Sequence, residues 1–227
     1  MIKVEHIEVF NFEGAIRGLR NPMNSWDKSD SIKCYANRNC PGICKNNSCG
    51  LCVGDADLDL MQRLFKAGTE HRKYLRQIFV SMDIVAPVYF VSELDTYKVG
   101  TVRNSCSFMH KGVSKPFEIT DFSTHDVLVV DGAPSRYDRN ANAWKTILDT
   151  LNQLREEYLD TKDNDIFQQI RCLLPSGYNQ RFTLTMNYEN VFSIIKQRTG
   201  HRLNEWDEFI KILKTLPYVK EIGGYED

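Results

Sequence analysis

The stretch DADLDLMQRLFKAGTEHRKYLRQIFVSMDIVAP, residues 55–87, decides the fold prediction for this chain. Its apolar residues recur at alternating steps of four and three, which is the spacing of one face of an α-helix. The acidic start favours a helix N-terminus, and Pro87 bends or ends the helix. The pattern therefore predicts a long helix with an apolar stripe formed by Leu64, Gly68, His71, Leu75, Ile78 and Met82.

His71 is the residue of this stripe that raises a functional question. On an apolar stripe, a lone histidine is more often a packed core residue than a ligand contact. The cations Arg72, Lys73 and Arg76 fall beside the stripe, however, and would surround the histidine with positive charge. Periodicity alone favours a core histidine and leaves the cationic rim unexplained.

The remaining segments alternate between strand and helix patterns. Residues 2–10 predict a half-buried strand, residues 12–20 a short helix, and residues 21–54 a long loop. Residues 126–131 predict a further strand. The helical segments that complete the chain are expected at residues 143–160, 165–175, 181–198 and 203–216.

Composition excludes several classes of protein. The chain has 227 residues, 42% of them hydrophobic and 26% charged, as in globular proteins. The net charge is −1, so no general basicity predicts binding to duplex nucleic acid. No apolar run is long enough to span a membrane, and the first ten residues do not resemble a signal peptide. We therefore expect no membrane association and a cytoplasmic location.

Five of the seven cysteines gather in CYANRNCPGICKNNSCGLC, residues 34–52. The thiolates of Cys40, Cys44, Cys49 and Cys52 are close enough in sequence to surround one tetrahedral metal ion, with Cys34 as an alternative ligand. Zinc in a structural role is the first prediction. An iron–sulfur cluster and unpaired thiols are the alternatives.

Two runs of residues resemble one enzyme family. The first is residues 55–90, and the second is IRCLLPSGYNQRFTLTMNYENVFSIIKQR, residues 170–198. They are similar to segments of the flavin-dependent thymidylate synthases, which methylate dUMP with a reduced flavin. In the first run, the spacing to Ala86 and Pro87 places His71 at the first flavin-contacting histidine of the family. In the second, the family has Arg-x-x-Leu-Pro, then a strand, an asparagine, and an arginine that closes a helix.

The family's signature, Arg-His-Arg-x-x-Ser-x-Asn-Glu-x-Ser-x-Arg, is only loosely matched. Without a gap it aligns with TYKVGTVRNSCSF, residues 96–108, where Lys98 keeps the charge and Thr101 keeps a hydroxyl. A shift of one residue instead aligns Asn104 and Ser107 with signature residues. A third alignment uses MHKGVS, residues 109–114. The chain thus resembles a divergent subgroup with a degenerate signature and an inserted cysteine-rich loop.

The resemblance implies an α/β (α+β) fold with a central mixed sheet, long helices and a helical C-terminal third. It implies one domain over residues 1–227, with the cysteine-rich loop inserted at about 33–53. The implied cofactor is FAD, with NADPH and methylenetetrahydrofolate as co-substrates and dUMP or a related pyrimidine nucleotide as substrate. The implied assembly is a homotetramer with active sites at subunit interfaces.

The resemblance also assigns roles to residues. Arg198 is the predicted catalytic residue, because a guanidinium against the uracil would stabilise negative charge that develops on the ring. Apart from the resemblance, Cys172 lies within an apolar helical run, which predicts a core residue rather than a nucleophile. The implied cofactor-binding residues are His71, Lys73, Arg76, Tyr97, Lys98, Asn187, Ser193 and His201. The implied substrate-binding residues are Glu93, Asn104, Ser105, Ser107, Arg171 and Arg198.

A second class of function competes with this enzyme. The loose signature favours a non-catalytic or retasked homologue, either a metal-stabilised nucleotide-binding protein or a modifier of another pyrimidine nucleotide. His71, Arg171, Asn187 and Arg198 favour the enzyme.

Overall fold

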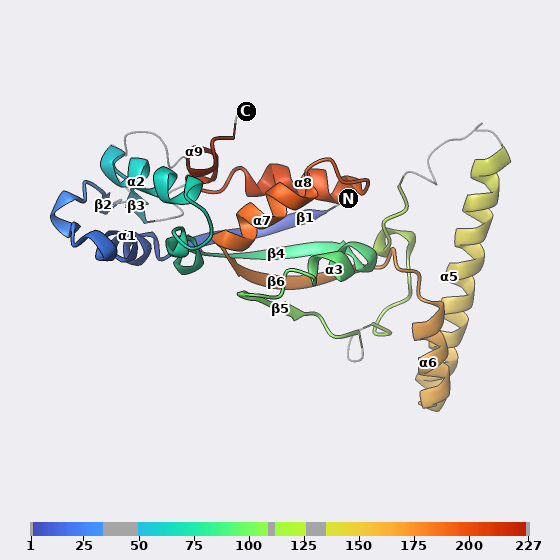
Figure 1. Cartoon of the computed structure of the whole chain (residues 1–227). Helices are drawn as coiled ribbons and strands as arrows, with labels where there is room; N and C mark the ends of the chain where they lie inside the picture. Colours follow the sequence, from blue (N-terminus) through green and yellow to red (C-terminus); the bar gives the residue numbers. More distant parts are fainter. Residues whose placement is uncertain (1, 34–49, 109–111, 126–134, 226–227) are drawn as a thin grey trace. The chain divides into compact units, whose positions relative to one another are not determined.

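The computed structural model describes residues 2–33, 50–108, 112–125 and 135–225 (Figure 1). Its longer helices and strands are β1 (Lys3–Phe10), α1 (Phe12–Arg20), β2 (Ile32–Lys33), β3 (Leu51–Cys52), α2 (Asp55–Lys66), β4 (Phe79–Pro87), α3 (Val88–Leu94), β5 (Thr101–Ser105), α5 (Ser135–Thr161), α6 (Asn164–Leu173), β6 (Asn179–Asn187), α7 (Tyr188–Arg198), α8 (Asn204–Leu213) and α9 (Val219–Gly223). Short 3-10 helices are η1 (Asn21–Met23), η2 (Trp26–Lys28), η3 (Lys73–Gln77) and η4 (Ile119–Asp121).

The chain divides into two compact units. Unit 1 comprises Met1–Lys3, Val85–Asp95 and Ser105–Phe182, and unit 2 comprises Val4–Ile84, Thr96–Asn104 and Thr183–Asp227. Helices α5 and α6 belong to unit 1, whereas α7, α8 and α9 belong to unit 2. The expectation of one domain over residues 1–227 stays a prediction.

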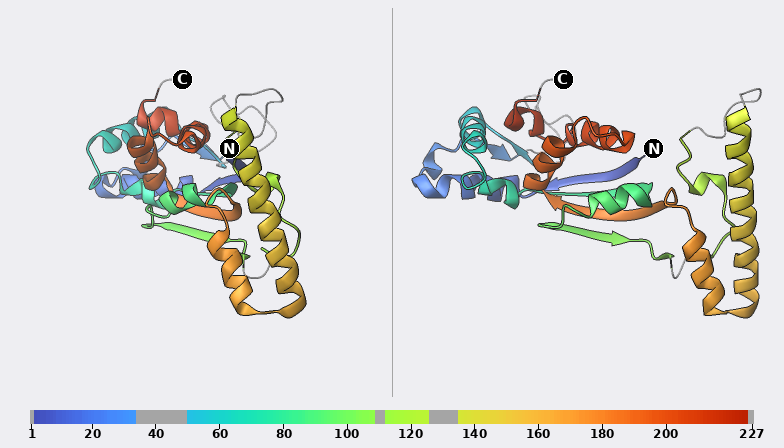
Figure 2. Two further views of the ribbon diagram at one scale, coloured as in Figure 1. Left: turned by 90° about the vertical axis from the view of Figure 1, so that its right-hand side faces the viewer. Right: turned by 45° about the vertical axis from the view of Figure 1, so that its right-hand side comes forward.

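The main sheet has four strands in the order β1-β4-β6-β5. Val80, Met82 and Ile84 of β4 are buried, while the residues between them are half-buried. This period of two is expected of a strand with one covered face. Helices α7 and α8 lie along one face of the sheet (Figures 1 and 2).

Side-chain hydrogen bonds record how β4 and β6 pair. The Thr183 hydroxyl donates to Asp83 over 2.6 Å, and the Thr185 hydroxyl donates to Ser81 over 3.2 Å. The partner number falls as the residue number rises, so these strands run antiparallel. The predicted α/β class is confirmed, and the central sheet is antiparallel rather than mixed.

The long helix predicted across residues 64–82 is wrong. Helix α2 ends at Lys66, and Gly68 adopts a φ of 105°, a left-handed conformation that favours glycine and interrupts the helix. The short helix η3 and strand β4 follow. Apolar residues at 78, 80 and 82 satisfy the period of a strand, and 75, 78 and 82 satisfy that of a helix, so periodicity over this stretch was ambiguous.

The same ambiguity affects residues 181–198. Their first part belongs to strand β6, in which Phe182, Leu184 and Met186 are buried, and only residues 188–198 form helix α7. The resemblance predicted this strand, whereas the helical pattern did not. The helix predicted from residue 203 is present as α8.

Unit 1 contains the helical pair α5 and α6, which pack side by side (Figures 1 and 2). Leu151 of α5 and Phe167 and Ile170 of α6 share one buried cluster with Phe117 and Phe122. Helix α5 begins earlier than predicted, at residue 135. The strand predicted at residues 126–131 lies outside the described residues.

A buried ion pair holds the N-terminal part of unit 2. The carboxylate of Asp57 is 0% exposed, and it accepts hydrogen bonds from Arg20 Nε (2.5 Å), Ser29 Oγ (2.7 Å) and Ser31 Oγ (2.6 Å). Burial alone would raise the pKa of Asp57, but the bonds from Ser31, Ser29 and Arg20 outweigh it and lower that pKa. The bonds from Ser29 and Ser31 hold residues 29–31 in place. Strand β2, which pairs antiparallel with β3, begins at the next residue.

Within the described ranges, no helix is long and apolar enough to cross a lipid bilayer.

Candidate functional site

Arg198, the predicted catalytic residue, lies at the C-terminal end of helix α7 in unit 2. Its Nε donates to the Tyr97 hydroxyl over 2.9 Å, and its Nη1 lies 3.2 Å from His201 Nε2. Its guanidinium carbon lies 4.6 Å from the centre of the Trp206 ring. These four residues, which we call the Arg198 cluster, therefore surround one guanidinium with aromatic rings and hydrogen-bonding groups.

The local backbone explains why His201 faces Arg198. Helix α7 ends at Arg198, and Gly200 adopts a φ of 76°, which turns the chain back on itself. The His201 amide then donates to the Arg198 carbonyl over 3.1 Å. The imidazole is thereby held beside the guanidinium.

The imidazole of His201 has more neighbouring donors than it can accept. Its Nδ1 lies 3.2 Å from the Leu203 amide, and its Nε2 lies 3.2 Å from Arg198 Nη1. A neutral imidazole has one accepting nitrogen, so it cannot accept from both groups. When Nδ1 accepts from Leu203, Nε2 carries a hydrogen and lies beside Arg198 Nη1, so two N–H donors stand together at this point of the cluster. The arrangement suits a carbonyl or a phosphate oxygen.

A polar network extends from Arg198 along one side of α7. The Tyr97 hydroxyl lies 3.4 Å from Gln197 Oε1, and Gln197 Nε2 donates to the Ser193 hydroxyl over 2.7 Å. Lys98, next to Tyr97, is exposed. The structure thus gathers Tyr97, Ser193, Arg198 and His201, which the sequence had assigned separately.

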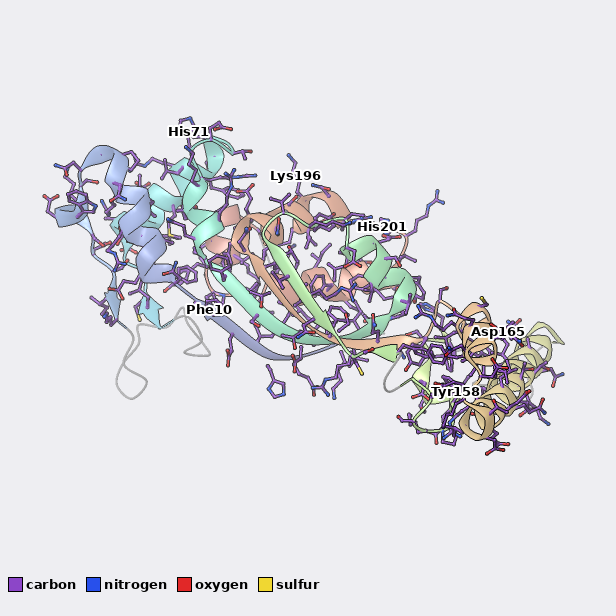
Figure 3. All side chains as sticks on the ribbon, turned by 90° about the horizontal axis from the view of Figure 1, so that it is seen from below. Phe10, His71, Tyr158, Asp165, Lys196 and His201 are labelled. Atoms are coloured by element: carbon purple, nitrogen blue, oxygen red, sulfur yellow. The ribbon has the colours of Figure 1, made fainter. Side chains whose placement is uncertain are left out.

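His71, Lys73 and Arg76 lie elsewhere in unit 2. All three are exposed and belong to the turn and short helix between α2 and β4, so the prediction of a stripe-facing histidine is wrong. Figure 3 shows His71 well separated from His201 within unit 2. Arg72, not His71, makes the specific contact here: its guanidinium pairs with Glu189 over 2.6 Å. One chain therefore does not bring His71 to the Arg198 cluster.

Asn187 is a buried helix cap. Its side chain accepts from the Asn190 amide over 3.1 Å at the start of α7. Gly100 lies against the Asn187 amide group, and a Cβ at Gly100 would clash with Asn187 Nδ2. Asn187 thus stabilises the corner at which α7 begins, and a contact with flavin stays a prediction.

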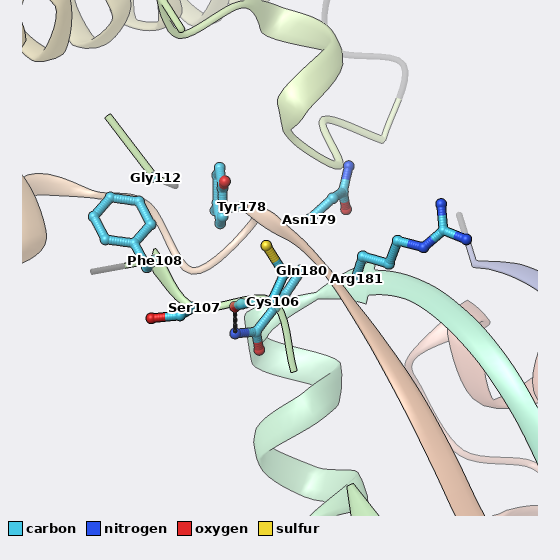
Figure 4. Close-up of a pocket in the computed structure, with 8 residues that line it drawn as sticks. All are labelled: Cys106, Ser107, Phe108, Gly112, Tyr178, Asn179, Gln180 and Arg181. Atoms are coloured by element: carbon cyan, nitrogen blue, oxygen red, sulfur yellow. Dashed lines mark hydrogen bonds between the residues drawn. The ribbon is translucent and has the colours of Figure 1, made fainter. Parts of the chain in front are cut away.

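Unit 1 contains two neighbouring clefts. One, of about 140 Å³, is lined by residues that include Cys106, Ser107, Gln180 and Arg181 (Figure 4). The other, of about 330 Å³, has an apolar wall and includes Arg171. Phe108, Tyr178 and Gln180 line both clefts. An aromatic wall beside an arginine is suited to a planar ligand with an anionic group.

Tyr178 is the titratable group common to both clefts. Burial raises the pKa of its phenol, and the electrostatic effects of nearby Asp121 and Cys106 raise it further, against the opposing effect of Lys115. The phenol therefore keeps its proton at neutral pH. Tyr178 can donate a hydrogen bond to an anionic ligand in either cleft.

The remaining predicted substrate residues are only partly brought together. Ser107 and Arg171 line the two clefts. Glu93 and Ser105 are half-buried in unit 1, and Asn104 is exposed in unit 2. The prediction that Cys172 is a core residue is wrong, because its side chain is exposed on α6.

Sequence reasoning missed three residues of these sites. Tyr178 and Gln180 lie inside the second family-like run, seven and nine residues after Arg171. Their nearness in sequence to this predicted substrate-binding arginine could have indicated them. Trp206 had no such signal, because a tryptophan in a helix with an apolar face is usually a core residue.

The predicted metal ligands Cys34, Cys40, Cys44 and Cys49 lie outside the described residues. Cys52 is described: it is buried in β3, where it pairs with Ile32. Among the residues that the structure describes, no group of three or more metal-ligating side chains comes together. The zinc site stays a prediction.

Comparison with solved structures identifies the fold. Over 97% of this chain and 94% of the other, the fold is similar to thymidylate synthase X (ThyX) from Helicobacter pylori, solved with FAD and dUMP, with a TM-score of 0.61 at 16% identity. It is also similar to the UMP/dUMP methylase PolB from Streptomyces cacaoi, bound with 5-Br dUMP, with a TM-score of 0.58 at 18% identity over 95% and 89% of the two chains. No protein-family model and no curated protein matches the sequence. The chain therefore has a ThyX-like fold.

Proposed function

We propose that this chain is a flavin-dependent enzyme that methylates dUMP to dTMP, with methylenetetrahydrofolate and NADPH as co-substrates. The observation that carries the proposal is the Arg198 cluster together with the polar network that extends from it to Ser193. Four residues assigned by the resemblance, Tyr97, Ser193, Arg198 and His201, meet in one network. The likeness of the fold to proteins solved with FAD and dUMP supports the same assignment.

The donors of this cluster suit FAD and a pyrimidine ring. The isoalloxazine and uracil rings both carry carbonyl oxygens, which can accept hydrogen bonds from N–H groups of Arg198 and His201. When bound, reduced flavin supplies the hydride for the pyrimidine. Arg198 would orient the uracil and stabilise negative charge on it, and Tyr97 would hold the guanidinium in place.

The clefts of unit 1, taken by themselves, also offer groups suited to a nucleotide. Arg171 supplies a bidentate donor suited to phosphate, and Tyr178 supplies a protonated phenol. Phe108 and Tyr178 provide an apolar wall. Substrate binding through these residues would be tested by the dependence of KM on each side chain.

Activity is tested most directly by tritium release from C5-labelled dUMP, assayed with FAD, NADPH and methylenetetrahydrofolate. Arg198→Lys keeps the positive charge but removes the planar guanidinium and its paired N–H donors. We therefore expect kcat to fall about 10²- to 10³-fold, as for loss of one transition-state donor. Arg202→Lys, at the exposed neighbouring arginine, is the matched control and should keep full activity. A purified protein that takes up no FAD in the presence of dUMP would contradict the proposal. The same assay with UMP shows which nucleotide is used.

We propose a homotetramer whose active sites combine residues of different subunits. The separation of His71 from His201 in one chain supports this assembly. Mixing inactive His71→Ala protein with inactive Arg198→Lys protein, followed by subunit exchange, should restore part of the activity. If the sites were built from one chain only, the mixture would stay inactive.

A non-catalytic homologue is the second candidate. It is favoured by the loose signature: in the ungapped alignment only Lys98 keeps the charge and Thr101 the hydroxyl of their counterparts, and Arg103 and Asn104 replace the Asn-Glu pair. Such a protein would bind a pyrimidine nucleotide, would be stabilised by zinc in the cysteine-rich loop, and would be colourless when purified. Binding of dUMP without tritium release would support it.

A further inference from the structure

Trp206 lies at the centre of the Arg198 cluster, although no role has been assigned to it so far. Its side chain is 0% exposed. The Tyr97 and His201 rings lie 6.1 Å and 6.3 Å from the indole, both edge-on, and the Arg198 guanidinium lies over its face at 4.6 Å. Three residues assigned to the ligand site thus share one buried platform.

The indole is itself held by the core. Trp206 lies in the first turn of α8, whose buried face continues through Phe209, Ile210 and Leu213. The Phe209 ring lies 6.3 Å from the indole. Because a close-packed interior leaves a large ring no alternative rotamer, the plane of the indole is fixed before any ligand binds.

A fixed aromatic plane constrains the guanidinium. A cation prefers the face of an aromatic ring, and indole is the most favourable ring for this contact. A long arginine side chain otherwise samples many rotamers and would have to be ordered when the ligand binds. The Tyr97 hydroxyl accepts from Nε and Nη1 lies beside His201 Nε2, so the indole ring and these two partners together fix the orientation of the guanidinium.

We propose that Trp206 is a positioning residue. It sets the orientation of the Arg198 guanidinium, and it keeps the Tyr97 and His201 side chains in place beside that guanidinium. That the ligand is a pyrimidine nucleotide rests on the function proposed above. The orientation of Arg198 does not rest on it, because the contacts are present in the chain itself.

The test compares Trp206→Leu, Trp206→Phe and a control, Phe12→Leu. Phe12 is 1% exposed in unit 2 and packs on Tyr188 and Tyr218, outside the Arg198 cluster, so its replacement matches the loss of core packing. The first readout needs no ligand: phenylglyoxal modifies arginines, and mass spectrometry of peptides gives the rate at Arg198 relative to exposed Arg202. We expect that ratio to rise about 2- to 5-fold in Trp206→Leu, the equivalent of one lost cation–π contact, and to stay unchanged in Phe12→Leu.

The second readout is turnover of dUMP. Trp206→Leu should lower kcat/KM about tenfold or more relative to Phe12→Leu, since a misplaced Arg198 fails to orient the reacting ring. Trp206→Phe, which keeps an aromatic face, should restore most of that loss.

The outcomes separate the two proposals. An Arg198 modification ratio that is the same in wild type, Trp206→Leu and Phe12→Leu overturns the positioning role. If the ratio is raised in Trp206→Leu but the wild-type protein turns over neither dUMP nor UMP, the positioning role is supported and the proposed function is refuted. If Trp206→Leu does not fold, Trp206→Met, which also removes the aromatic face, takes its place: an unchanged ratio overturns the proposal, and an increase above wild type supports it.

Discussion

Replacing Asp57 by Asn should strongly destabilise unit 2. Arg20 and Asp57 have side chains that are 5% and 0% exposed, so neutralising the carboxylate leaves a buried guanidinium without its counter-charge. Removing one partner of a buried pair costs about 3–5 kcal/mol. Asn keeps one accepting oxygen for Arg20 or Ser31, so we place the loss near the lower limit, at about 3 kcal/mol.

The assay is urea unfolding at pH 7, monitored by fluorescence, which gives the free energy of unfolding. The matched control is Asp59→Asn, on the same helix. Asp59 and its partner Arg63 are 63% and 65% exposed, so this change should cost under about 0.5 kcal/mol.

The pH dependence supplies a second check. Because the folded-state pKa of Asp57 is lowered, the unfolded chain binds its proton first as pH falls. The stabilisation is complete above the unfolded pKa and is lost as pH falls through the folded pKa. The difference between wild type and Asp57→Asn should therefore begin to shrink below about pH 5. A difference under about 1 kcal/mol at pH 7, or one that does not shrink in acid, would refute the reasoning.

Three further changes test other parts of the chain. Arg171→Ala should raise KM for dUMP about 10- to 100-fold in steady-state assays, since a charge-assisted bond to phosphate is lost, while kcat changes little. Asn187→Ala should lower the free energy of unfolding by about 1 kcal/mol through loss of the α7 cap, and Asn187→Asp should retain most of it in the same urea titration. Cys49→Ser should abolish zinc content measured by elemental analysis, whereas Cys172→Ser, at the exposed thiol of α6, should leave it unchanged.

The candidate site shows how far a sequence can assign individual residues. Arg198 and His201 are close in sequence at the end of one helix, so their proximity follows from local structure. Tyr97 is about a hundred residues away, and only the tertiary fold brings its hydroxyl to the guanidinium. His71 shows the opposite result: a match in sequence spacing did not bring it to the Arg198 cluster within one chain.

The order of elements followed largely from local patterns. The strand before residue 11, the helix at 12–20 and the helices of the α5 and α6 pair depend on periodicity and end signals within a few residues, which folding preserves. Local patterns could not distinguish helix from strand in residues 64–87 and 181–187, because the apolar spacing there fits both. Pairing between β4 and β6 makes these segments strands.

By itself, the sequence determined the α/β class, the positions of most helices, and the charged and aromatic residue types available for a nucleotide and flavin site. Those properties depend on near neighbours along the chain. Only the tertiary structure decided the antiparallel sheet, the buried ion pair of Arg20 and Asp57, and the platform that Trp206 forms beneath Arg198. Each of these arises from contacts between residues distant in sequence, whose geometry depends on how whole elements pack.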